Sequence, residues 1–367
     1  MKKILIVSSV SRQFYLFEQG NIEVLKSLGY EIHAAANFND VNERLDTLDI
    51  IRHHFDIERS PFSFKNSKAY YQLKHIMKSE KFDAIHCHSP IGGVLARLAA
   101  KAVGNCPVIY TAHGFHFYKG ARFINWAIYY PVERLLARYT DHLITINKED
   151  FKKANEFKAG QIHYVPGIGV DTDAFNNTAL NREMKRMELG ISDDTFVLLS
   201  IGELIKRKNL ETLIRAIVKL ENQNFVLLIC GRGVLESFLK ELTVSLEIQE
   251  KVRFLGFRND IKEICIASDV FVFPSYQEGL PVSVMEAMSA GLPVIASEIR
   301  GNTDLIKNGV GGYLLSPDDI NGFSESIQVL LEDAKLRKDM SVKNKDEVKR
   351  YDSSIIKNKM REIYSSL

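Results

Sequence analysis

Short apolar runs alternate with longer amphipathic segments along most of the chain. Continuous apolar runs of about four to eight residues are typical of strands that are buried on both faces of a parallel sheet. The segments between them, such as residues 14–28 and 92–103, have the spacing of helices that cover such a sheet. In the first half of the chain this pattern predicts strands at residues 4–8, 31–36, 84–87, 108–111 and 143–146.

The alternation is interrupted between residues 165 and 195, where Pro, Gly, Asp and other polar residues predict a loop and a linker. A second series then begins, with predicted strands at residues 196–201, 225–230, 252–255, 271–273 and 294–296. Strands that alternate with helices predict an α/β fold with doubly wound parallel sheets. Because 367 residues are also too many for one ordinary core, we predict two Rossmann-like domains, over residues 1–175 and 176–345.

Composition narrows the class of protein. Hydrophobic residues make up 46% and charged residues 26%, as in an ordinary soluble globular protein, and the net charge of +2 gives no reason to expect a nucleic-acid partner. The four cysteines lack Cys-x-x-Cys spacing, which is typical of reduced core thiols in a cytosolic protein. The apolar run within residues 1–10 is too short for a signal peptide, and no run approaches the roughly 20 apolar residues of a membrane span.

One stretch combines the parts of an anion-binding site. Residues 271–297 have the pattern of strand, loop, helix, turn and strand, with Pro281 in the first turn of the helix. The loop amides around Gly279 and Leu280 would lie at the positive end of the helix dipole, which stabilises an anion. Glu278 lies in the loop and Glu286 one to two turns into the helix. Amides for phosphates and carboxylates for hydroxyls predict a nucleotide-diphosphate sugar as the ligand, although two solvated glutamates are the simpler interpretation.

The same stretch resembles the Glu-x-x-x-x-x-x-x-Glu signature of glycosyltransferase family four, whose members are retaining enzymes with the GT-B fold. The matching positions are Ser275, Glu278-Gly279, Glu286-Ala287 and the Gly-Leu-Pro-Val run from Gly291. The rest of the chain agrees, so the resemblance covers nearly its full length. It implies two Rossmann-like domains that face each other across a cleft, with a C-terminal helix at residues 346–367 that crosses back to the first domain. It also implies chemistry that needs no metal ion or other cofactor.

The resemblance implies roles for the residues of this stretch. Glu278 would lie beside the hydroxyls of the donor sugar, and Glu286 would hold the ribose of the nucleotide. The loop and first helical turn would bind the diphosphate through Gly279, Leu280, Pro281 and Val282. A charged acceptor makes strong hydrogen bonds to neutral hydroxyls in a dry cleft, so these assignments are chemically sound.

A second motif, SIGELIKRKN, follows the first strand of the second domain at residues 200–209. In the family, a Gly-Arg-Leu sequence and a later lysine bind the diphosphate. Gly202, Leu204 and Lys208 match that pattern. Glu203 stands in place of the arginine, and if it pointed inward it would repel a diphosphate by about 1–4 kcal/mol. We therefore expect Glu203 to point away and Lys206 or Arg207 to supply the second cation, although a solvated basic turn would have the same sequence.

Several histidines follow predicted strands of the first domain. His113 would lie at the carboxyl edge of the sheet, where ligands bind in such folds, and in similar enzymes a histidine at this place touches the donor sugar. His116 would lie on the acceptor side or in the crevice. A core or capping histidine is the alternative in each case. Together with His86 and His88 these residues could share one face and bind a metal, but no supporting acidic residue or Asp-x-Asp motif is evident, and we expect no metal site.

Three further segments are expected to line the crevice between the domains. The sequence VPGIGVD at residues 165–171 is similar to a Gly-rich loop of the family, in which Gly169 would allow close backbone approach, unless the loop is a simple hinge. Gly256 and Arg258 resemble the edge that receives the nucleotide base. The first strand is followed by Ser9 and further polar residues in place of Gly-x-Gly-x-x-Gly, which disfavours a dehydrogenase. Ser9 is then expected on the acceptor side.

The resemblance implies that a hexosyl or N-acetylhexosaminyl group moves, with retention, from a nucleotide-diphosphate donor to a lipid-linked saccharide. The donor is expected to be a UDP-sugar and the pathway that of a capsule or exopolysaccharide. Residues 119–138 combine aromatic side chains with four cations, which suits peripheral contact with the inner face of the cell membrane, although a core-facing helix explains them equally. A cytoplasmic location follows. A GT-B nucleotide-sugar epimerase and a non-catalytic nucleotide-sugar-binding partner remain as alternatives.

Overall fold

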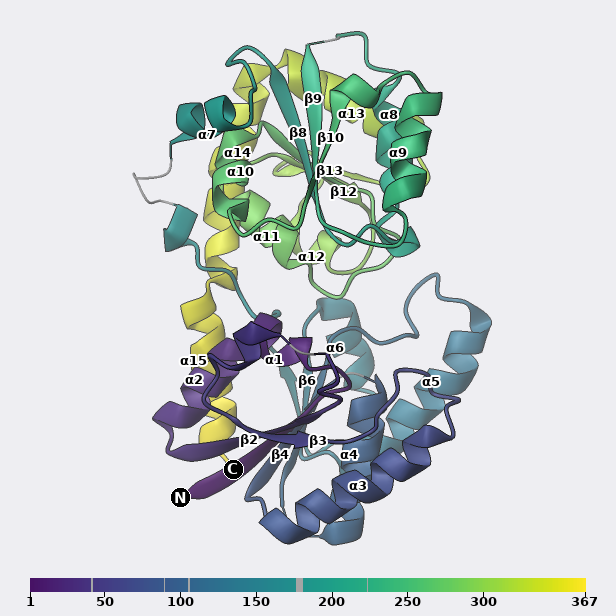
Figure 1. Ribbon diagram of the computed structural model, residues 1–367, viewed down its shortest axis with the longest axis vertical. Helices are drawn as coiled ribbons and strands as arrows, with labels where there is room; N and C mark the ends of the chain where they lie inside the picture. The colour runs from purple at the N-terminus through teal and green to yellow at the C-terminus, as the bar shows by residue number, and fades with distance from the viewer. Residues whose placement is uncertain (41, 89, 105, 176–180, 223) are drawn as a thin grey trace. The chain divides into compact units, whose positions relative to one another are not determined.

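The computed structural model describes residues 1–40, 42–88, 90–104, 106–175, 181–222 and 224–367 (Figure 1). These residues divide into two compact units, one formed by Met1–Ile168 together with Ser353–Leu367 and the other by Gly169–Asp352. The sequence placed the domain limits at residues 175 and 345, so the first crossing of the chain lies a few residues before its predicted position and the second a few residues after it. Residues 176–180 of the predicted linker lie outside the described residues.

The first unit is built on a parallel sheet with the strand order β3-β2-β1-β4-β5-β6-β7 among the described residues. Its strands are β1 (Lys2–Val7), β2 (Tyr30–Ala36), β3 (Ile51–His54), β4 (Ala84–His88), β5 (Val108–Ala112), β6 (His142–Thr145) and β7 (Gln161–Tyr164). Alternate residues of β1 face opposite sides, since Ile4 and Ile6 belong to one hydrophobic cluster and Leu5 and Val7 to another. The strand order reverses between β1 and β4, and ligands of such folds bind beyond the carboxyl ends of the strands at this point.

Helices cover both faces of this sheet. They are α1 (Arg12–Phe17), α2 (Gln19–Ser27), α3 (Lys65–Glu80), α4 (Pro90–Val103), α5 (Phe123–Leu136), α6 (Lys148–Ala154) and α15 (Ser353–Ser365), with short 3-10 turns η1 (Glu43–Leu45) and η2 (Ala137–Tyr139). Leu73 of α3 and Leu95 of α4 pack on one side of the sheet, and Leu25 of α2 and Met360 of α15 on the other. The single helix expected at residues 14–28 is interrupted at Glu18, which separates α1 from α2.

The second unit contains a parallel sheet with the order β10-β9-β8-β11-β12-β13 among the described residues. Its strands are β8 (Phe196–Ile201), β9 (Phe225–Cys230), β10 (Val252–Gly256), β11 (Val270–Phe273), β12 (Val294–Ser297) and β13 (Gly312–Leu315). Its helices are α7 (Arg182–Glu188), α8 (Leu210–Ile217), α9 (Glu236–Ser245), α10 (Ile261–Ala267), α11 (Val282–Ser289), α12 (Asn302–Leu305), α13 (Ile320–Glu332) and α14 (Ala334–Val348), with turns η3 (Asp173–Phe175), η4 (Lys206–Lys208), η5 (Gln249–Lys251) and η6 (Lys349–Tyr351). The order reverses between β8 and β11, so the two motifs singled out in this half of the sequence follow the two strands at the reversal.

The last helix, α15, packs beside α2 in the first unit (Figure 1). Ile356, Met360, Ile363 and Tyr364 bury one side of α15 against the core that contains Ile4. The chain leaves and re-enters this unit through two segments that run together, since Val170 N donates to Tyr351 O over 3.0 Å. Within the part of the chain that the structure describes, no helix is long and apolar enough to cross a membrane.

Candidate active site

A cluster of charged side chains lies beyond the carboxyl ends of β8 and β11. Glu278 follows β11, and its Oε1 atom lies 2.8 Å from Lys208 Nζ and 2.8 Å from Arg207 Nη1. The Glu278 side chain is only 8% exposed, so it needs these cations. Arg207 Nη1 also donates to Gln277 O over 2.7 Å, and Arg300 Nε donates to Glu278 O over 3.1 Å. The structure thus brings together the two motifs that the sequence singled out in this half of the chain.

Lys208 owes its position to the shape of the loop after β8. Its ammonium lies 4.5 Å from the centroid of the Phe273 ring, and a Cβ atom on Gly202 would come within 3.1 Å of its Cε. A glycine at position 202 therefore leaves room for the lysine stem. Burial lowers the pKa of Lys208, and the neighbouring Glu278 carboxylate acts in the opposite direction. Lys208 is consequently a largely buried cation whose charge is stabilised mainly by the Glu278 carboxylate, with a smaller contribution from Glu203.

The other residues of this loop differ in what they touch. Arg207 reaches Glu278, whereas Lys206 is exposed and Glu203 is exposed at the position where the family has an arginine. Arg207 is thus the second cation, after Lys208, that contacts the Glu278 carboxylate. The sequence left open whether Lys206 or Arg207 accompanies Lys208. In the structure, Arg207 is the one that lies beside Glu278.

The loop before α11 leads into the positive end of the helix dipole, which suits an anion. Residues 279–282 precede and begin this helix, and Pro281, which has no N–H, is its N-cap. The loop is held by close contact, because a Cβ atom on Gly301 would lie 2.4 Å from Gly279 O. Within the described chain, the buried atoms Ser275 Oγ, Ser297 Oγ and Asn302 Oδ1 have no hydrogen-bond partner. Buried polar atoms are normally paired, so this group near the ends of β11 and β12 marks a place where water or a ligand completes the bonding.

Glu286 lies on α11, partly buried, and its carboxylate accepts no hydrogen bond from any residue that the structure describes. Burial raises the pKa of Glu286 to about 7, and Lys262 of α10 acts in the opposite direction. A carboxyl with this pKa changes charge near neutral pH. The ribose-binding role that the family resemblance implies for Glu286 stays a prediction.

Gly256 and Arg258, which were expected to receive the nucleotide base, have different surroundings. Gly256 ends β10 with φ of +66°, and Gly231 N donates to its carbonyl over 2.7 Å. Arg258 is engaged elsewhere, because its Nε donates to Asp260 over 2.7 Å and its guanidinium also approaches Glu188. Gly231 in turn lies against the loop of Gly202, since a Cβ atom on Gly231 would clash with Gly202 O at 1.9 Å.

The first unit carries a second polar cluster, next to a cavity of about 210 Å³ that lies entirely within this unit. His113, just after β5, contacts His88 at the end of β4, with 3.0 Å between His113 Nε2 and His88 Nδ1. His88 Nε2 lies 3.3 Å from an oxygen of Glu18, and both side chains are 1% exposed. No role was predicted for Glu18, although it lies in the amphipathic segment 14–28, four residues from each of the buried Phe14 and Ile22.

These histidines do not form the four-residue set considered from the sequence. Atoms of Glu18, His86 and His88 lie within 4.8 Å of one another, so the expectation that no acidic residue supports the histidines is wrong. His86 is already engaged, because its ring nitrogens lie 2.8 Å from Tyr364 Oη and 2.8 Å from Thr111 Oγ1. His116 packs against the Tyr129 ring instead. Both ring nitrogens of His86 therefore already have hydrogen-bond partners within the protein.

Two further residues that were predicted to line a crevice lie at the end of a strand and at the start of the second unit. Ser9 is buried just after β1, and Gly169 has φ of +77° at the first residue of the second unit. On α5, Trp126 and Tyr130 pack against Phe117, whereas Phe123 is 84% and Ile124 is 55% exposed. The helix therefore has a core-facing side and an exposed apolar end.

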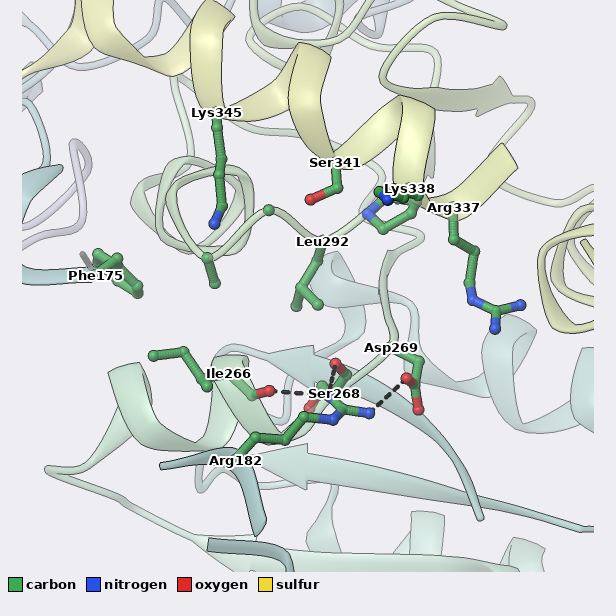
Figure 2. Close-up of a pocket in the computed structure, with 13 residues that line it drawn as sticks. Phe175, Arg182, Ile266, Ser268, Asp269, Leu292, Arg337, Lys338, Ser341 and Lys345 are labelled. Atoms are coloured by element: carbon green, nitrogen blue, oxygen red, sulfur yellow. Dashed lines mark hydrogen bonds and ion pairs between the residues drawn. The ribbon is translucent and has the colours of Figure 1, made fainter. Parts of the chain in front are cut away.

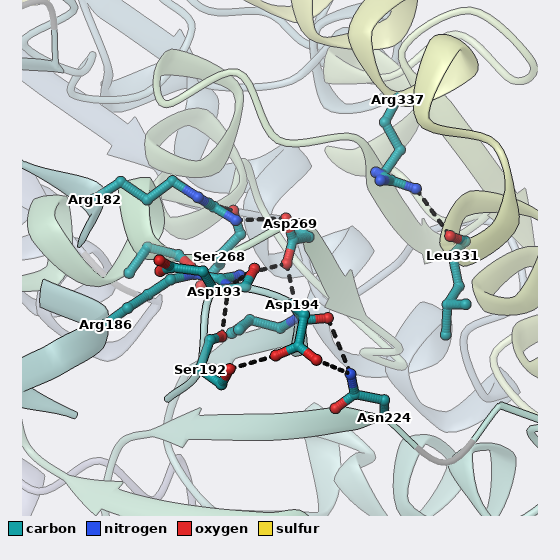
Figure 3. Close-up of polar contacts among 12 residues, drawn as sticks. Arg182, Arg186, Ser192, Asp193, Asp194, Asn224, Ser268, Asp269, Leu331 and Arg337 are labelled. Carbon is teal, nitrogen blue, oxygen red and sulfur yellow. Dashed lines mark hydrogen bonds and ion pairs between the residues drawn. The ribbon is translucent and has the colours of Figure 1, made fainter. Parts of the chain in front are cut away.

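A cavity of about 500 Å³ in the second unit lies at the other end of its sheet (Figure 2). Asp269 precedes β11 and Leu292 precedes β12, so the cavity borders the amino ends of these strands. Arg182 and Arg186 of α7 both pair with Asp269, at 2.7 and 2.8 Å (Figure 3). Arg182 also donates to two carbonyl groups in this wall. These contacts join α7 to the sheet and indicate a structural role.

Comparisons with known proteins identify the class. The two parallel α/β units have the GT-B fold, as predicted: the structure matches HepE from Anabaena, solved with UDP and glucose, with a TM-score of 0.81 and 20% identity over 100% of both chains. Residues 181–347 match the family described as glycosyl transferases group 1, and residues 3–147 match the family described as glycosyl transferase 4-like. The chain therefore belongs to glycosyltransferase family four, as its motifs indicated.

Two relatives illustrate this membership. The chain is 36% identical to the putative glycosyltransferase EpsD of Bacillus subtilis, over 100% of this chain and 97% of that protein. It is 34% identical to the UDP-Gal:α-D-GlcNAc-diphosphoundecaprenol α-1,3-galactosyltransferase of Escherichia coli, over 73% of this chain and 71% of that protein. The protein is thus a glycosyltransferase.

Proposed function

We propose that this glycosyltransferase moves a sugar, with retention of the anomeric configuration, from a UDP-sugar to a hydroxyl of a lipid-linked saccharide during the synthesis of a surface polysaccharide. The observation that carries the proposal is the convergence of Lys208 and Arg207 on Glu278 beside the start of α11. This arrangement offers cations and amides to a diphosphate and a carboxylate to the hydroxyls of a sugar.

The donor would be held by the second unit. Lys208, Arg207 and the backbone at Gly279–Val282 would stabilise the charge that builds up on the leaving diphosphate, which is where electrostatic stabilisation contributes most. Glu278 would orient the sugar, and Glu286 would accept hydrogen bonds from the ribose. Gly202 supports this by leaving space for Lys208. Gly256 and Arg258 would lie near the base, with Gly256 contributing backbone only.

The acceptor would be bound by the first unit, where Ser9 follows β1. His113, which follows β5, would be catalytic together with Glu278, because the two side chains would touch the donor sugar and hold it in position. Support for a lipid-linked acceptor comes from the Escherichia coli relative, whose name gives α-D-GlcNAc-diphosphoundecaprenol as its acceptor and UDP-Gal as its donor. The exposed Phe123 and Ile124 at the start of α5 are preceded by Lys119 and Arg122, which suits peripheral contact with the inner face of the membrane. His116 and Gly169 would line the acceptor side. The proposed chemistry needs no metal ion or cofactor.

The central test is Glu278→Gln, which keeps the size of the side chain and removes its charge. We expect turnover to fall by about 10²–10³-fold, because the variant loses the acceptor for the sugar hydroxyls and leaves Lys208 less well paired. The matched control is Glu325→Gln on the exposed side of α13, which should retain full activity. A folded Glu278→Gln protein with unchanged turnover would refute the proposed site.

The donor and the stereochemistry can be examined separately. A thermal-shift screen over nucleotide sugars should single out one donor, since a ligand at one hundred times its Kd adds about 2.7 kcal/mol of stability. NMR of the product should then show the anomeric configuration of the donor sugar, and an inverted linkage would overturn the retaining mechanism. Conversion of the donor into a sugar isomer without any acceptor would favour an epimerase instead.

A further inference from the structure

The cavity of about 500 Å³ in the second unit is separate from the proposed donor site (Figure 2). Its lining comes from residues between 175 and 345, so it lies within one unit, beside the amino ends of β11 and β12. The proposed donor site lies at the opposite end of the same sheet, beyond the carboxyl ends of β8 and β11. The volume of this cavity is within the range of pockets that hold small molecules. The chemistry of its walls therefore indicates what it would bind.

One wall of the cavity is a face of α14 whose polar side chains are not used within the protein. Lys338, Ser341 and Lys345 are three and four residues apart, so they lie on one side of this helix. Figure 2 shows all three on the same side of the cavity. In the part of the chain that the structure describes, none of these side chains forms a hydrogen bond or an ion pair with another residue. Their two ammonium groups and one hydroxyl are therefore available to a ligand.

The acidic residues of α14 that form ion pairs do so away from this wall. Asp346 and Glu347 pair with Lys349 and Arg350, three residues further along the chain, and none of these four residues lines the cavity. Arg337 does line it, and its guanidinium donates to two backbone carbonyl groups (Figure 3). These contacts hold the Arg337 side chain without neutralising its charge. The wall formed by α14 is therefore basic.

The opposite wall contributes one carboxylate, which is already fully paired. Asp269 Oδ1 accepts from Arg182 Nη2 over 2.7 Å, and Asp269 Oδ2 accepts from Arg186 Nη2 over 2.8 Å (Figure 3). Val197 N donates to the same Oδ2 over 2.8 Å. Asp269 is the one acidic residue among the described residues of the lining, and the cations of the lining are Arg182, Arg337, Lys338 and Lys345. The cavity therefore has an excess of positive charge and would attract an anion.

The two unpaired groups nearest to the turn after α11 are held there by close packing. Gly291 has φ of +82°, and a Cβ atom at this position would lie 2.5 Å from Ser341 Oγ and 2.6 Å from Lys345 Cε. Asn344 Nδ2 also donates to Leu292 O over 2.7 Å and so fixes α14 against this turn. Groups that are already in position lose less entropy when a ligand binds, which favours affinity.

The rest of the lining is mainly apolar. Phe175 and Leu292 are buried, and Ile266 and Pro293 extend the same surface. Such a surface suits the carbon part of a ligand, whereas ammonium and hydroxyl groups suit an anion with several acceptor oxygens. A phosphate monoester combines these two parts in one small molecule.

We propose that this cavity is a binding site for a small organic phosphate. Lys338, Ser341 and Lys345 donate to the phosphate oxygens, and the apolar surface that includes Phe175 and Leu292 contacts the carbon part. The site lies apart from Glu278 and Lys208, and the proposal does not rest on the proposed function. No covalent step takes place there.

The first test is a titration with phenyl phosphate, which has a phosphate group and a ring. In ¹H–¹⁵N spectra of the full chain we expect the amide signals of α14 and of residues 290–292 to move. Inorganic phosphate should move the same signals with about tenfold lower affinity, because it has no ring to bury. Equal affinity for the two probes would overturn the assignment of the apolar surface. Movement confined to the loop of Lys208 would overturn the proposed site.

The second test removes charge from the wall formed by α14. The double variant Lys338→Gln with Lys345→Gln should raise the Kd for phenyl phosphate by about tenfold or more, since each lysine contributes a charge-assisted hydrogen bond. The matched control is Lys335→Gln with Lys343→Gln, which removes the same charge from exposed positions of α14 outside the lining and should change the Kd less than about twofold. Equal losses in the two double variants would show a diffuse basic surface and overturn the site.

Two further measurements complete the design. Both double variants should unfold at the same urea concentration as the wild type, because all four lysines are exposed, so a loss of binding would not reflect a loss of structure. Lys208→Met should bind phenyl phosphate at α14 as the wild type does. Loss of that binding in Lys208→Met would place the probe in the donor site and overturn the proposal. Failure of the proposed function would appear in Glu278→Gln and leave binding at α14 unchanged.

Discussion

Lys208 Nζ and Glu278 Oε1 lie 2.8 Å apart, with 12% and 8% of their side chains exposed. The cation proposed to bind the diphosphate is therefore already paired with the carboxylate proposed to bind the sugar. Burying an ion pair costs free energy of desolvation. Removing only one of its partners destabilises the protein strongly, because the remaining buried charge is left without a counter-ion. The pair would thus hold the site in position for a donor that brings both an anion and hydroxyl groups.

Replacing Lys208 with Met should separate the role of its charge from that of its stem. Methionine keeps an unbranched apolar side chain beside Phe273 but cannot stabilise the leaving diphosphate. We expect kcat/KM to fall by about 10²–10³-fold. Steady-state kinetics with Lys206→Met as the control provides the check, because Lys206 is exposed and should change the rate less than about twofold. Equal losses at both positions would indicate a diffuse basic surface.

Arg207 is predicted to be the second phosphate cation in place of the arginine that Glu203 replaces. Its side chain is 38% exposed, so its charge is better screened than that of Lys208. We expect Arg207→Ala to weaken donor binding by about tenfold, a smaller effect than the loss of Lys208. Calorimetric titration with the nucleoside diphosphate measures this, and Lys206→Ala should bind as the wild type does. Full affinity in Arg207→Ala would contradict the assignment.

The sequence predicts the interior strands well because burial on both faces requires continuous apolar runs. The strands that it missed are β3, β7 and β13. The first of these, IRHH, is largely exposed, and β7 is exposed or half-buried along its length, so neither has the apolar run on which the prediction relied. β13 begins with Gly312, whose missing Cβ allows close contact with Val294 O. These three strands lie at the edges of their sheets and are specified by pairing with a neighbour, which their own sequences do not record; the edge strand β10 was predicted because it keeps an apolar pattern.

The sequence predicts the site residues that belong to a motif. It does not predict those that are brought together only by tertiary packing. Glu278 and Lys208 follow strands that the apolar pattern places correctly, so their convergence could be anticipated. Whether Lys206 or Arg207 joins them depends on the direction of side chains within the short turn η4, which a basic tripeptide does not reveal. Glu18 was missed because its partner His88 is distant in the sequence and only the parallel sheet brings them together.

A buried ion pair should anchor the strand that leads to His113. Arg97 Nη2 donates to Glu133 Oε2 over 2.9 Å, and Tyr110 Oη donates to Glu133 Oε1 over 3.0 Å. We expect Glu133→Ala to reduce the free energy of unfolding by about 3–5 kcal/mol, since Arg97 would remain buried without its counter-ion. Urea unfolding tests this, with exposed Arg134→Ala as a control that should change stability by less than about 0.5 kcal/mol.

The double variant Arg97→Met with Glu133→Leu distinguishes a lost charge partner from lost packing. Removing both charges also removes the uncompensated guanidinium, so the double variant should recover much of the stability lost in Glu133→Ala. The Tyr110 hydroxyl would still lack its acceptor, so recovery should be incomplete. A double variant that is less stable than Glu133→Ala would show that the apolar stems and the Tyr110 contacts matter more than the charges.

Glu286 should make both stability and donor binding depend on pH, in opposite directions. Its pKa of about 7 in the folded protein exceeds that of an unfolded chain, so the folded protein retains a proton between about pH 4.5 and 7 that the unfolded chain has released. Stability should therefore fall as pH rises through this interval. Glu286→Gln should be more stable than the wild type at pH 8, by up to about 3 kcal/mol, and equally stable at pH 4. Thermal unfolding at both pH values measures this.

The same substitution should weaken donor binding, because an amide accepts a ribose hydrogen bond less strongly than a carboxylate does. Wild-type affinity should rise as the pH passes through about 7, and binding near that pH should release a fraction of a proton, measurable by calorimetry in buffers of different ionisation enthalpy. Glu286→Gln should bind with no such proton release, and Glu325→Gln, on the exposed side of α13, should behave as the wild type. A variant that gained stability without losing affinity would place the ribose elsewhere. If Glu286→Gln gains stability and also loses donor affinity, the ionisable carboxyl lowers the stability of the protein but is retained because donor binding requires it.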